Sequence, residues 1–158
     1  MSANKLNTNY NLYFHDPYSY DWNLSSYEKL TDIKSIEDYS QIEFLTREII
    51  HLGMFFTMRE NVIPLWNETN NNYSFSIKIL KNDAMWYWNY FNSLLLSENL
   101  LKEKYVKKWD ILNGISISPK KNFCIIKIWA SELLEEDIRN IIKIPNKYTG
   151  DIIIKHYN

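Results

Sequence analysis

The fold is decided by residues 110–129, which read DILNGISISPKKNFCIIKIW. Apolar and polar side chains alternate along both halves of this stretch, as in strands with one buried face. The two halves are joined by Pro119-Lys120-Lys121-Asn122, which has the residue types of a turn. The sequence therefore predicts an antiparallel hairpin whose strands cover residues 110–118 and 123–129, with Ile125, Lys127 and Trp129 on one face.

Five further segments have the composition of strands. They are residues 11–14, 27–33, 54–58, 73–80 and 152–154. The 70–72 stretch of three asparagines before the fourth of them predicts a turn.

Three helices are expected between these strands. The first begins at Ser35, with Asp38 completing an N-cap box and Gly53 at its end, and its apolar face comprises Ile36, Tyr39, Ile42, Leu45 and Ile49. A second runs from an Asp83 cap to about Ser97. A third is capped by Ser131 and continues through Leu134, Ile138, Ile141 and Ile142.

Hairpin-type strands interleaved with three helices indicate an α+β fold, a mostly antiparallel sheet with helices on one face. The other face is then free for a ligand. No linker or repeat divides the chain, so we expect one domain over residues 10–158 after a flexible N-terminus, residues 1–9.

Composition excludes most familiar chemistry. The single cysteine, Cys124, and three scattered histidines give no metal-ligand spacing, and only three glycines occur, so no phosphate loop is present. We expect neither metal nor cofactor. The one dense acidic run, Glu132, Glu135, Glu136 and Asp137, is expected to start a helix, where carboxylates complement the helix dipole, so metal-assisted hydrolysis by a carboxylate cluster is disfavoured.

Charge and hydropathy limit the class of partner. Lys plus Arg (18) nearly balances Asp plus Glu (19), so a nucleic-acid ligand has to be short and recognised locally. The chain has no apolar run of membrane-spanning length and no secretory signal at its N-terminus, so we expect a cytoplasmic protein without membrane contact. The Asn- and Ile-rich composition points to an AT-rich viral or protist genome.

Two tryptophans, Trp22 and Trp66, lie in polar, loop-like stretches. A large aromatic ring on a loop is not placed in the hydrophobic core by a helix or strand of its own. It can fold back over the edge of the sheet, or it can stack on a flat ligand such as a nucleobase.

Several aromatic and strand motifs occur in one order. They are Trp22, Ile36-Glu37-Asp38-Tyr39, Val62-Ile63-Pro64-Leu65-Trp66, Trp88, Asn113-Gly114-Ile115-Ser116-Ile117 and Ile126-Lys127-Ile128-Trp129-Ala130-Ser131-Glu132. In this order and approximate spacing the chain resembles the eukaryotic mRNA cap-binding translation initiation factor 4E family from about residue 10 onward. The resemblance implies a curved antiparallel sheet backed by three helices on its convex face, with the cap bound on the concave face and no catalysis.

The resemblance assigns roles around the cap. It implies that Trp22 and Trp66 stack the 7-methylguanine base, whose positive charge adds a cation–π term, and that Trp129 contacts the methyl group. Tyr20 is an alternative to Trp22. Where the family has a glutamate that reads the base edge, this chain has Asn67, and the carboxylate follows at Glu68. Either residue can accept a hydrogen bond, and only Glu68 carries a negative charge.

The phosphate and partner positions also depart from the family pattern. Lys120 or Lys121 matches one basic position, whereas the second falls on Ile125, so Lys127 is a substitute for it. The predicted partner surface on the convex face, where the family binds helical partners, comprises Ile36, Tyr39, Asn89 and Ser93. Ile36 is kept, but Ser40 stands where the family has a tryptophan, and Asn89 and Ser93 replace apolar residues.

These departures leave two hypotheses. The chain is a monomeric cap-binding protein of translation that binds capped mRNA and a divergent scaffold-type initiation factor, or it is an interaction protein on the same fold that sequesters translation-factor partners without binding the cap.

Overall fold

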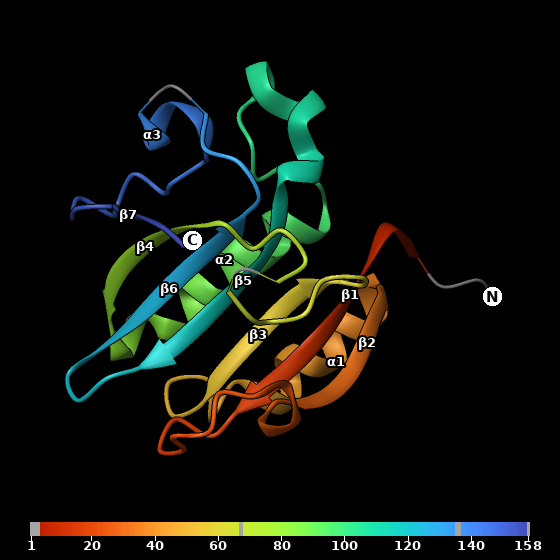
Figure 1. Cartoon of the computed structure of the whole chain (residues 1–158), viewed down its shortest axis with the longest axis vertical. Helices are drawn as coiled ribbons and strands as arrows, with labels where there is room; N and C mark the ends of the chain where they lie inside the picture. The colour runs from red at the N-terminus through yellow and green to blue at the C-terminus, as the bar shows by residue number, and fades with distance from the viewer. Residues whose placement is uncertain (1–3, 67, 135–136, 158) are drawn as a thin grey trace.

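A single antiparallel sheet organises the computed structural model, which describes residues 4–66, 68–134 and 137–157. Its seven strands lie in the order β2-β1-β3-β5-β6-β4-β7 (Figure 1). Their bounds are β1 Lys5–His15, β2 Glu28–Ser35, β3 Met54–Arg59, β4 Tyr73–Leu80, β5 Leu112–Pro119, β6 Phe123–Ala130 and β7 Ile153–His156.

The predicted hairpin is confirmed and lies at the centre of the sheet. Strands β5 and β6 pair with Ile117 opposite Ile126 and Ile115 opposite Ile128. A register shift between Leu112 and Gly114 makes Asn113 a bulge residue, which redirects its side chain. Outward from the hairpin, β3 pairs with β5 and β4 pairs with β6, so the hairpin joins the two halves of the sheet.

The first strand is longer than the sequence predicted. Strand β1 begins at Lys5, so residues 5–9 of the stretch expected to be loose belong to the sheet, and residues 1–3 lie outside the described residues. The pairing of Lys5 with Ser35 on β2 explains the extension, because a partner strand is available to a polar sequence.

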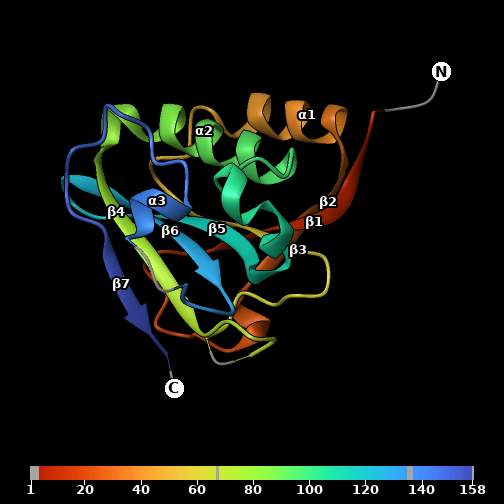
Figure 2. The same cartoon turned by 90° about the horizontal axis from the view of Figure 1, so that it is seen from above.

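Two long α-helices, α1 (Ile36–Thr46) and α2 (Ala84–Leu96), lie side by side on one face of the sheet (Figure 2). The Ser35 cap is confirmed, since its Oγ accepts from the Asp38 amide at 3.1 Å. The predicted end at Gly53 is wrong. Helix α1 stops at Thr46, and the chain continues through turns closed by Ile49 N–H to Thr46 C=O and Leu52 N–H to Ile49 C=O bonds.

The predicted apolar face of α1 is only partly buried. Ile42 is buried, whereas Ile36, Leu45 and Ile49 are 56%, 66% and 46% exposed. The helix packs against β2, the edge strand of the sheet, so the sheet covers only one side of its apolar stripe (Figure 1).

The caps predicted for the other two helices differ from the structure. Asp83 precedes α2 but makes no capping bond, because the short 3₁₀ turn η2 (Lys81–Asp83) leads directly into the helix. The third helix is limited to α3 (Ile138–Ile141) and is capped by Asp137. Ser131 does not start it, since its N–H donates to the Ile111 carbonyl and prolongs the pairing beyond β6; residues 135–136 lie outside the described residues.

A 3₁₀ segment, η3 (Glu103–Ile111), was not predicted. It contains three lysines, and Ile111 is its buried residue.

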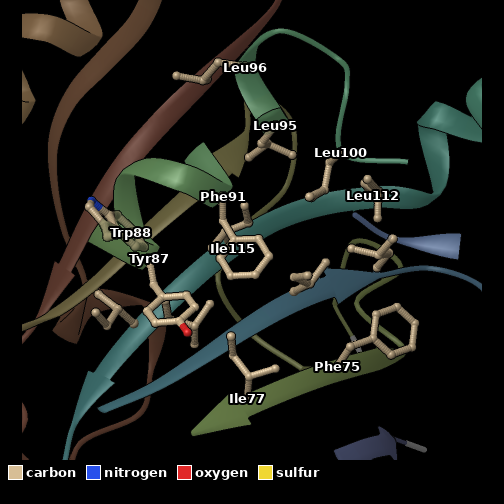
Figure 3. Close-up of a cluster of buried hydrophobic side chains, with 14 of the residues drawn as sticks. Phe75, Ile77, Tyr87, Trp88, Phe91, Leu95, Leu96, Leu100, Leu112 and Ile115 are labelled. Carbon is tan, nitrogen blue, oxygen red and sulfur yellow. The ribbon is translucent and has the colours of Figure 1, made fainter. Parts of the chain in front are cut away.

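The main core lies between the helices and the sheet. Trp88, Phe91 and Leu95 of α2 are buried in one cluster with Phe75 and Ile77 of β4 and Ile115 of β5. Figure 3 shows Phe91 lying close to Ile115. Period-two alternation sends every second strand residue into this core and the residues between them to the opposite side. We call that opposite side the open face. A second, smaller cluster of Phe56, Met58, Val62 and Trp129 lies there.

Candidate functional site

A cavity of about 500 Å³ is hollowed into the open face. This volume lies in the usual range for sites that bind small molecules. Its walls come from the two predicted tryptophan loops and from β3, β5 and β6. The lining residues are Trp22, Tyr27, Met54, Phe56, Leu65, Trp66, Glu68, Ser116, Ser118, Lys120, Lys127 and Trp129.

Of the residues singled out from the sequence, six come together here: Trp22, Trp66, Glu68, Trp129, Lys120 and Lys127. Lys121 lies in an adjoining cavity, and Tyr20 is 97% exposed and does not line this one. Asn67 lies outside the described residues. The site therefore has an aromatic part, one carboxylate and two lysines.

Both loop tryptophans lie against other rings. The Trp22 indole stacks on His15 with centroids 4.1 Å apart and planes 4° apart. His15 is fully buried, and its Nε2 donates to the Asp21 carbonyl at 2.7 Å, which fixes the loop directly before Trp22. One face of Trp22 is thus occupied, and 49% of the residue is exposed.

Trp66 is covered on both faces. Its centroid lies 3.6 Å from that of Trp129 and 3.8 Å from that of Tyr157, with interplanar angles of 11° and 3°. Two rings stacked so closely cannot share one face, so Trp129 and Tyr157 lie on opposite sides of the indole. A flat ligand can stack on Trp66 only after one of these contacts opens.

Trp129 is the fixed member of this stack. It is 2% exposed, and its Nε1–H donates to Ser116 Oγ at 2.9 Å. Its edge contact with Phe56, at 6.0 Å and 82°, continues the floor of the cavity toward β3. The backbone of a central strand and a buried hydrogen bond together hold this ring in place.

A buried asparagine holds the Trp66 loop in shape. Asn71 is fully buried, and its amide donates to the carbonyls of Ile63 at 2.7 Å and Leu65 at 2.9 Å. Asn113, the bulge residue of β5, donates to Asn71 Oδ1 at 2.9 Å. The loop is therefore anchored to the central strand, and the asparagine turn predicted at 70–72 has this further role.

The charges of the site are spread around the rings. Glu68 lies on the exposed side of the Trp66 loop, while Lys127 Nζ lies 5.6 Å from the Trp66 ring centroid. Burial raises the pKa of the Tyr27 hydroxyl to about 12, so this wall residue stays a neutral hydrogen-bond donor over the physiological range.

Sequence reasoning missed Tyr27, Phe56 and Ser116 of the lining, and it missed His15 and Tyr157 as ring partners. The alternation of residues 115–118 was a usable signal for Ser116, because it sends this residue to the face opposite the core. Residues 54–58 are apolar except for Thr57, so no alternation pointed to Phe56. Nothing in the local sequence pointed to Tyr157, whose position depends on the pairing of β7 with β4.

The predicted partner surface lies on the helical face. The Tyr39 hydroxyl donates to Asn89 Oδ1 at 2.5 Å, which joins α1 to α2, and burial raises the Tyr39 pKa. Beside this bond, a shallow cavity of about 380 Å³ is lined by Trp86, Asn89, Tyr90, Ser93 and Leu94. Ile36 stands 56% exposed at the start of α1.

Two further chemistries find no support in the described residues. Within them, no three His, Cys, Asp or Glu side chains cluster as metal ligands would. Over the same residues, no helix has the length and apolar character needed to cross a membrane.

Comparisons with known proteins agree with this geometry. The family model described as eukaryotic initiation factor 4E matches residues 5–153. The fold is similar to a schistosome initiation factor 4E solved with m7GpppA and a 4E-binding protein, with a TM-score of 0.72, 18% identity, and coverage of 85% of this chain and 75% of that one.

Two nematode structures are similar to a comparable degree. The Ascaris suum factor 4E-3 with the m7G cap gives a TM-score of 0.69, 13% identity and coverage of 87% and 79%. The C. elegans factor 4E-3 with the 4E-binding protein Mextli and a cap analogue gives a TM-score of 0.69 and 12% identity, with coverage of 87% of this chain and 80% of that one. No curated protein matches the chain in sequence.

Proposed function

The chain belongs to the eukaryotic initiation factor 4E family of non-enzymatic translation factors, and on this premise we propose that its open-face cavity binds the 7-methylguanosine cap of mRNA. Members of the family generally bind the cap in translation initiation. We propose that this protein acts there, in the cytoplasm, either in initiation or in its regulation.

The single observation that carries the proposal is that Trp22, Trp66 and Trp129, from two loops and a central strand, line one cavity with Glu68 and two lysines. An N7-methylated guanine is a flat cation, which gains both stacking and cation–π attraction from indoles. A carboxylate accepts hydrogen bonds from the base edge, and lysines complement the triphosphate.

In this proposal the base stacks between Trp22 and Trp66, and Trp129 contacts its methyl group. Glu68 accepts from the base edge, and Lys120 and Lys127 bind phosphate. The covered faces of Trp66 mean that ligand entry is coupled to opening of the Trp129–Trp66–Tyr157 stack. The cap-bound arrangement then differs from the present one mainly at the Trp66 side chain.

Fluorescence titration tests the proposal. Addition of 7-methyl-GTP is expected to quench tryptophan emission, whereas GTP has little effect because it lacks the cationic ring. Trp66→Ala is expected to weaken binding roughly 5- to 150-fold, the equivalent of one lost stacking contact of about 1–3 kcal/mol.

The matched control is Trp86→Ala, which removes a 46% exposed tryptophan on the helical face and leaves the cavity intact. Equal affinity for the methylated and unmethylated nucleotides would overturn the proposal.

A second candidate function is an interaction protein that keeps the fold and does not bind the cap. The covering of Trp66 on both faces favours it, because a ring without a free face offers a base nothing to stack on. The same titration distinguishes the two functions.

For the helical face we propose a divergent scaffold-type partner, bound by the protein as a monomer. Solved members of the family carry 4E-binding proteins. Here the Tyr39–Asn89 bond and exposed Ser93 replace apolar contacts, so the surface favours a partner helix with polar side chains at the matching positions.

A further inference from the structure

Three cavities form a series that passes the turn between β5 and β6, and each shares a lysine with the next. Lys120 lines both the open-face cavity and a second cavity of about 460 Å³. Lys81 lines both this second cavity and a third of about 220 Å³. The series continues from the open face toward the ends of α1 and η2.

The lining of the second cavity is basic and aromatic. Three lysines, Lys81, Lys120 and Lys121, line it together with Tyr18, and Pro17, Leu52 and Pro119 complete the lining. Glu and Asp are absent from its lining. Within the described parts of the chain, none of these three lysines forms an ion pair, so their charges are available to an outside anion.

Tyr18 is presented on a fixed loop. Its backbone N–H donates to Asp16 Oδ1 at 2.9 Å, which closes a turn, while the residue itself is 87% exposed. An exposed tyrosine ring in a cavity that lysines also line has the features of a site for single-stranded nucleic acid, in which a base stacks and the phosphates meet cations.

The third cavity extends the same chemistry. Besides Lys81 it is lined by Arg47, His51 and Asn82. Arg47 is paired with Glu43 at 2.9 Å, so Lys81 carries the unpaired charge at this end.

We propose that this series of cavities binds the first nucleotides of the RNA that follow the cap. The assignment rests on the proposed function, since it takes the cap cavity as the starting point. In a capped RNA the triphosphate that Lys120 would bind is joined to the first nucleotide of the RNA. Lys120 also lines the second cavity, so the RNA backbone would lead from the first cavity into the second. A net charge of −1 gives the whole molecule no attraction for RNA, so this local group of lysines supplies it.

The test compares ligands of increasing length. Affinities are measured by fluorescence for 7-methyl-GTP, for m7GpppA and for a capped adenosine oligonucleotide, at salt concentrations between about 50 and about 200 mM. The capped oligonucleotide is expected to bind about tenfold more tightly than 7-methyl-GTP at low salt, with a steeper dependence on salt.

Lys81→Glu and Tyr18→Ala are expected to remove this advantage while leaving the affinity for 7-methyl-GTP unchanged, because neither residue lines the cap cavity. For Lys81→Glu the salt slope should fall by about 0.7 or more, the value for one phosphate contact in a single strand. Lys107→Glu, an exposed lysine on η3, is the control of equal charge change.

Several results would overturn the assignment. One is a capped oligonucleotide that binds no better than 7-methyl-GTP, and another is an equal loss in Lys81→Glu and Lys107→Glu. Competition by polyglutamate as strong as that by RNA would show that the site accepts any polyanion.

The length series separates this inference from the proposed function. If 7-methyl-GTP fails to bind, the cap proposal fails. In that case an uncapped 5′-triphosphate oligonucleotide still tests the basic cavities, since its binding should be salt-dependent and lost in Lys81→Glu.

Discussion

At the scale of the residue, Trp66 is both the main ligand-binding candidate and a fully stacked side chain. Tyr157 covers its outer face and is itself held, with its N–H donating to the Asn72 carbonyl at 2.8 Å and its hydroxyl 3.2 Å from Ser74 Oγ. An aromatic pair is worth about 0.5–1.5 kcal/mol, less than base stacking at about 1–3 kcal/mol. Tyr157 therefore competes with a base for Trp66 without excluding it.

Tyr157→Ala is expected to strengthen binding of 7-methyl-GTP by about 2- to 12-fold, because Trp66 then has one stacked ring fewer to leave when the Trp129–Trp66–Tyr157 stack opens. The affinity is measured by titration. A ligand-free check is ¹⁹F NMR of protein labelled with 5-fluorotryptophan, in which the Trp66 signal, assigned by its loss in Trp66→Phe, should shift.

His156→Ala is the control, since this neighbour stacks on Tyr73 and not on Trp66. Weaker binding by Tyr157→Ala would mean that Tyr157 belongs to the ligand-binding surface.

The residues of the site were predictable to the extent that local sequence positions them. Trp22 and Trp66 could be singled out because large rings in polar loops are unusual, and Trp129 and Lys127 share a face by strand alternation. The stacking of Trp66 between Trp129 and Tyr157 could not be predicted, because it joins a loop, a central strand and an edge strand that are distant in the chain.

At the scale of the element, strands were more predictable than helices. The limits of β4 match the predicted 73–80 because its alternation and its turn residues are both local. The long third helix expected from Ser131 was wrong because the Ser131 N–H bonds to Ile111, a contact between distant residues that outweighs local helix signals.

At Gly114, which pairs with Met58, β5 approaches β3 closely. A Cβ atom added there would clash with the Thr57 carbonyl oxygen and lie 2.6 Å from Met58 Sδ. Thr57 and Met58 belong to β3, which pairs with β5 here. The Thr57 oxygen is a backbone atom and cannot move away as a flexible side chain can.

Gly114→Ala is therefore expected to lower the free energy of unfolding by about 1–3 kcal/mol, as overpacking of a tight interior does. Urea denaturation followed by far-UV circular dichroism measures the change. Gly150→Ala is the comparison, because its added Cβ would meet only the side chain of Tyr148, and it should cost less. Equal losses in the two variants would contradict the close approach of β3 and β5.

At the scale of the whole molecule, one sheet separates two surfaces. Figure 2 shows the helices α1 and α2 on one side of the sheet, and the predicted partner surface lies there. The cavity with the tryptophans lies on the open face. A ligand that binds only the folded sheet stabilises the entire molecule by mass action.

Addition of 7-methyl-GTP at a hundredfold excess over its Kd should stabilise the native state by about 2.7 kcal/mol. For a chain of this size that corresponds to a rise in Tm of about 5–10 °C. Differential scanning calorimetry measures it, with GTP as the control ligand and Trp66→Ala as the control variant. An equal rise with GTP would contradict recognition of the methylated base.

The strand order determines when each strand can find its pairing partners during synthesis. Both neighbours of β4 in the sheet, β6 and β7, follow it in the chain. Strand β3 can pair with β1 at once, but its second partner, β5, is made later. While the ribosome makes the segment between them, Phe75, Ile77 and Ile79 have no sheet to join. Pairing between distant segments is slow, and an unpaired apolar strand is a point of aggregation. The nascent chain therefore depends on prompt emergence of the β5–β6 hairpin, because this hairpin joins β3 and β4 into one sheet.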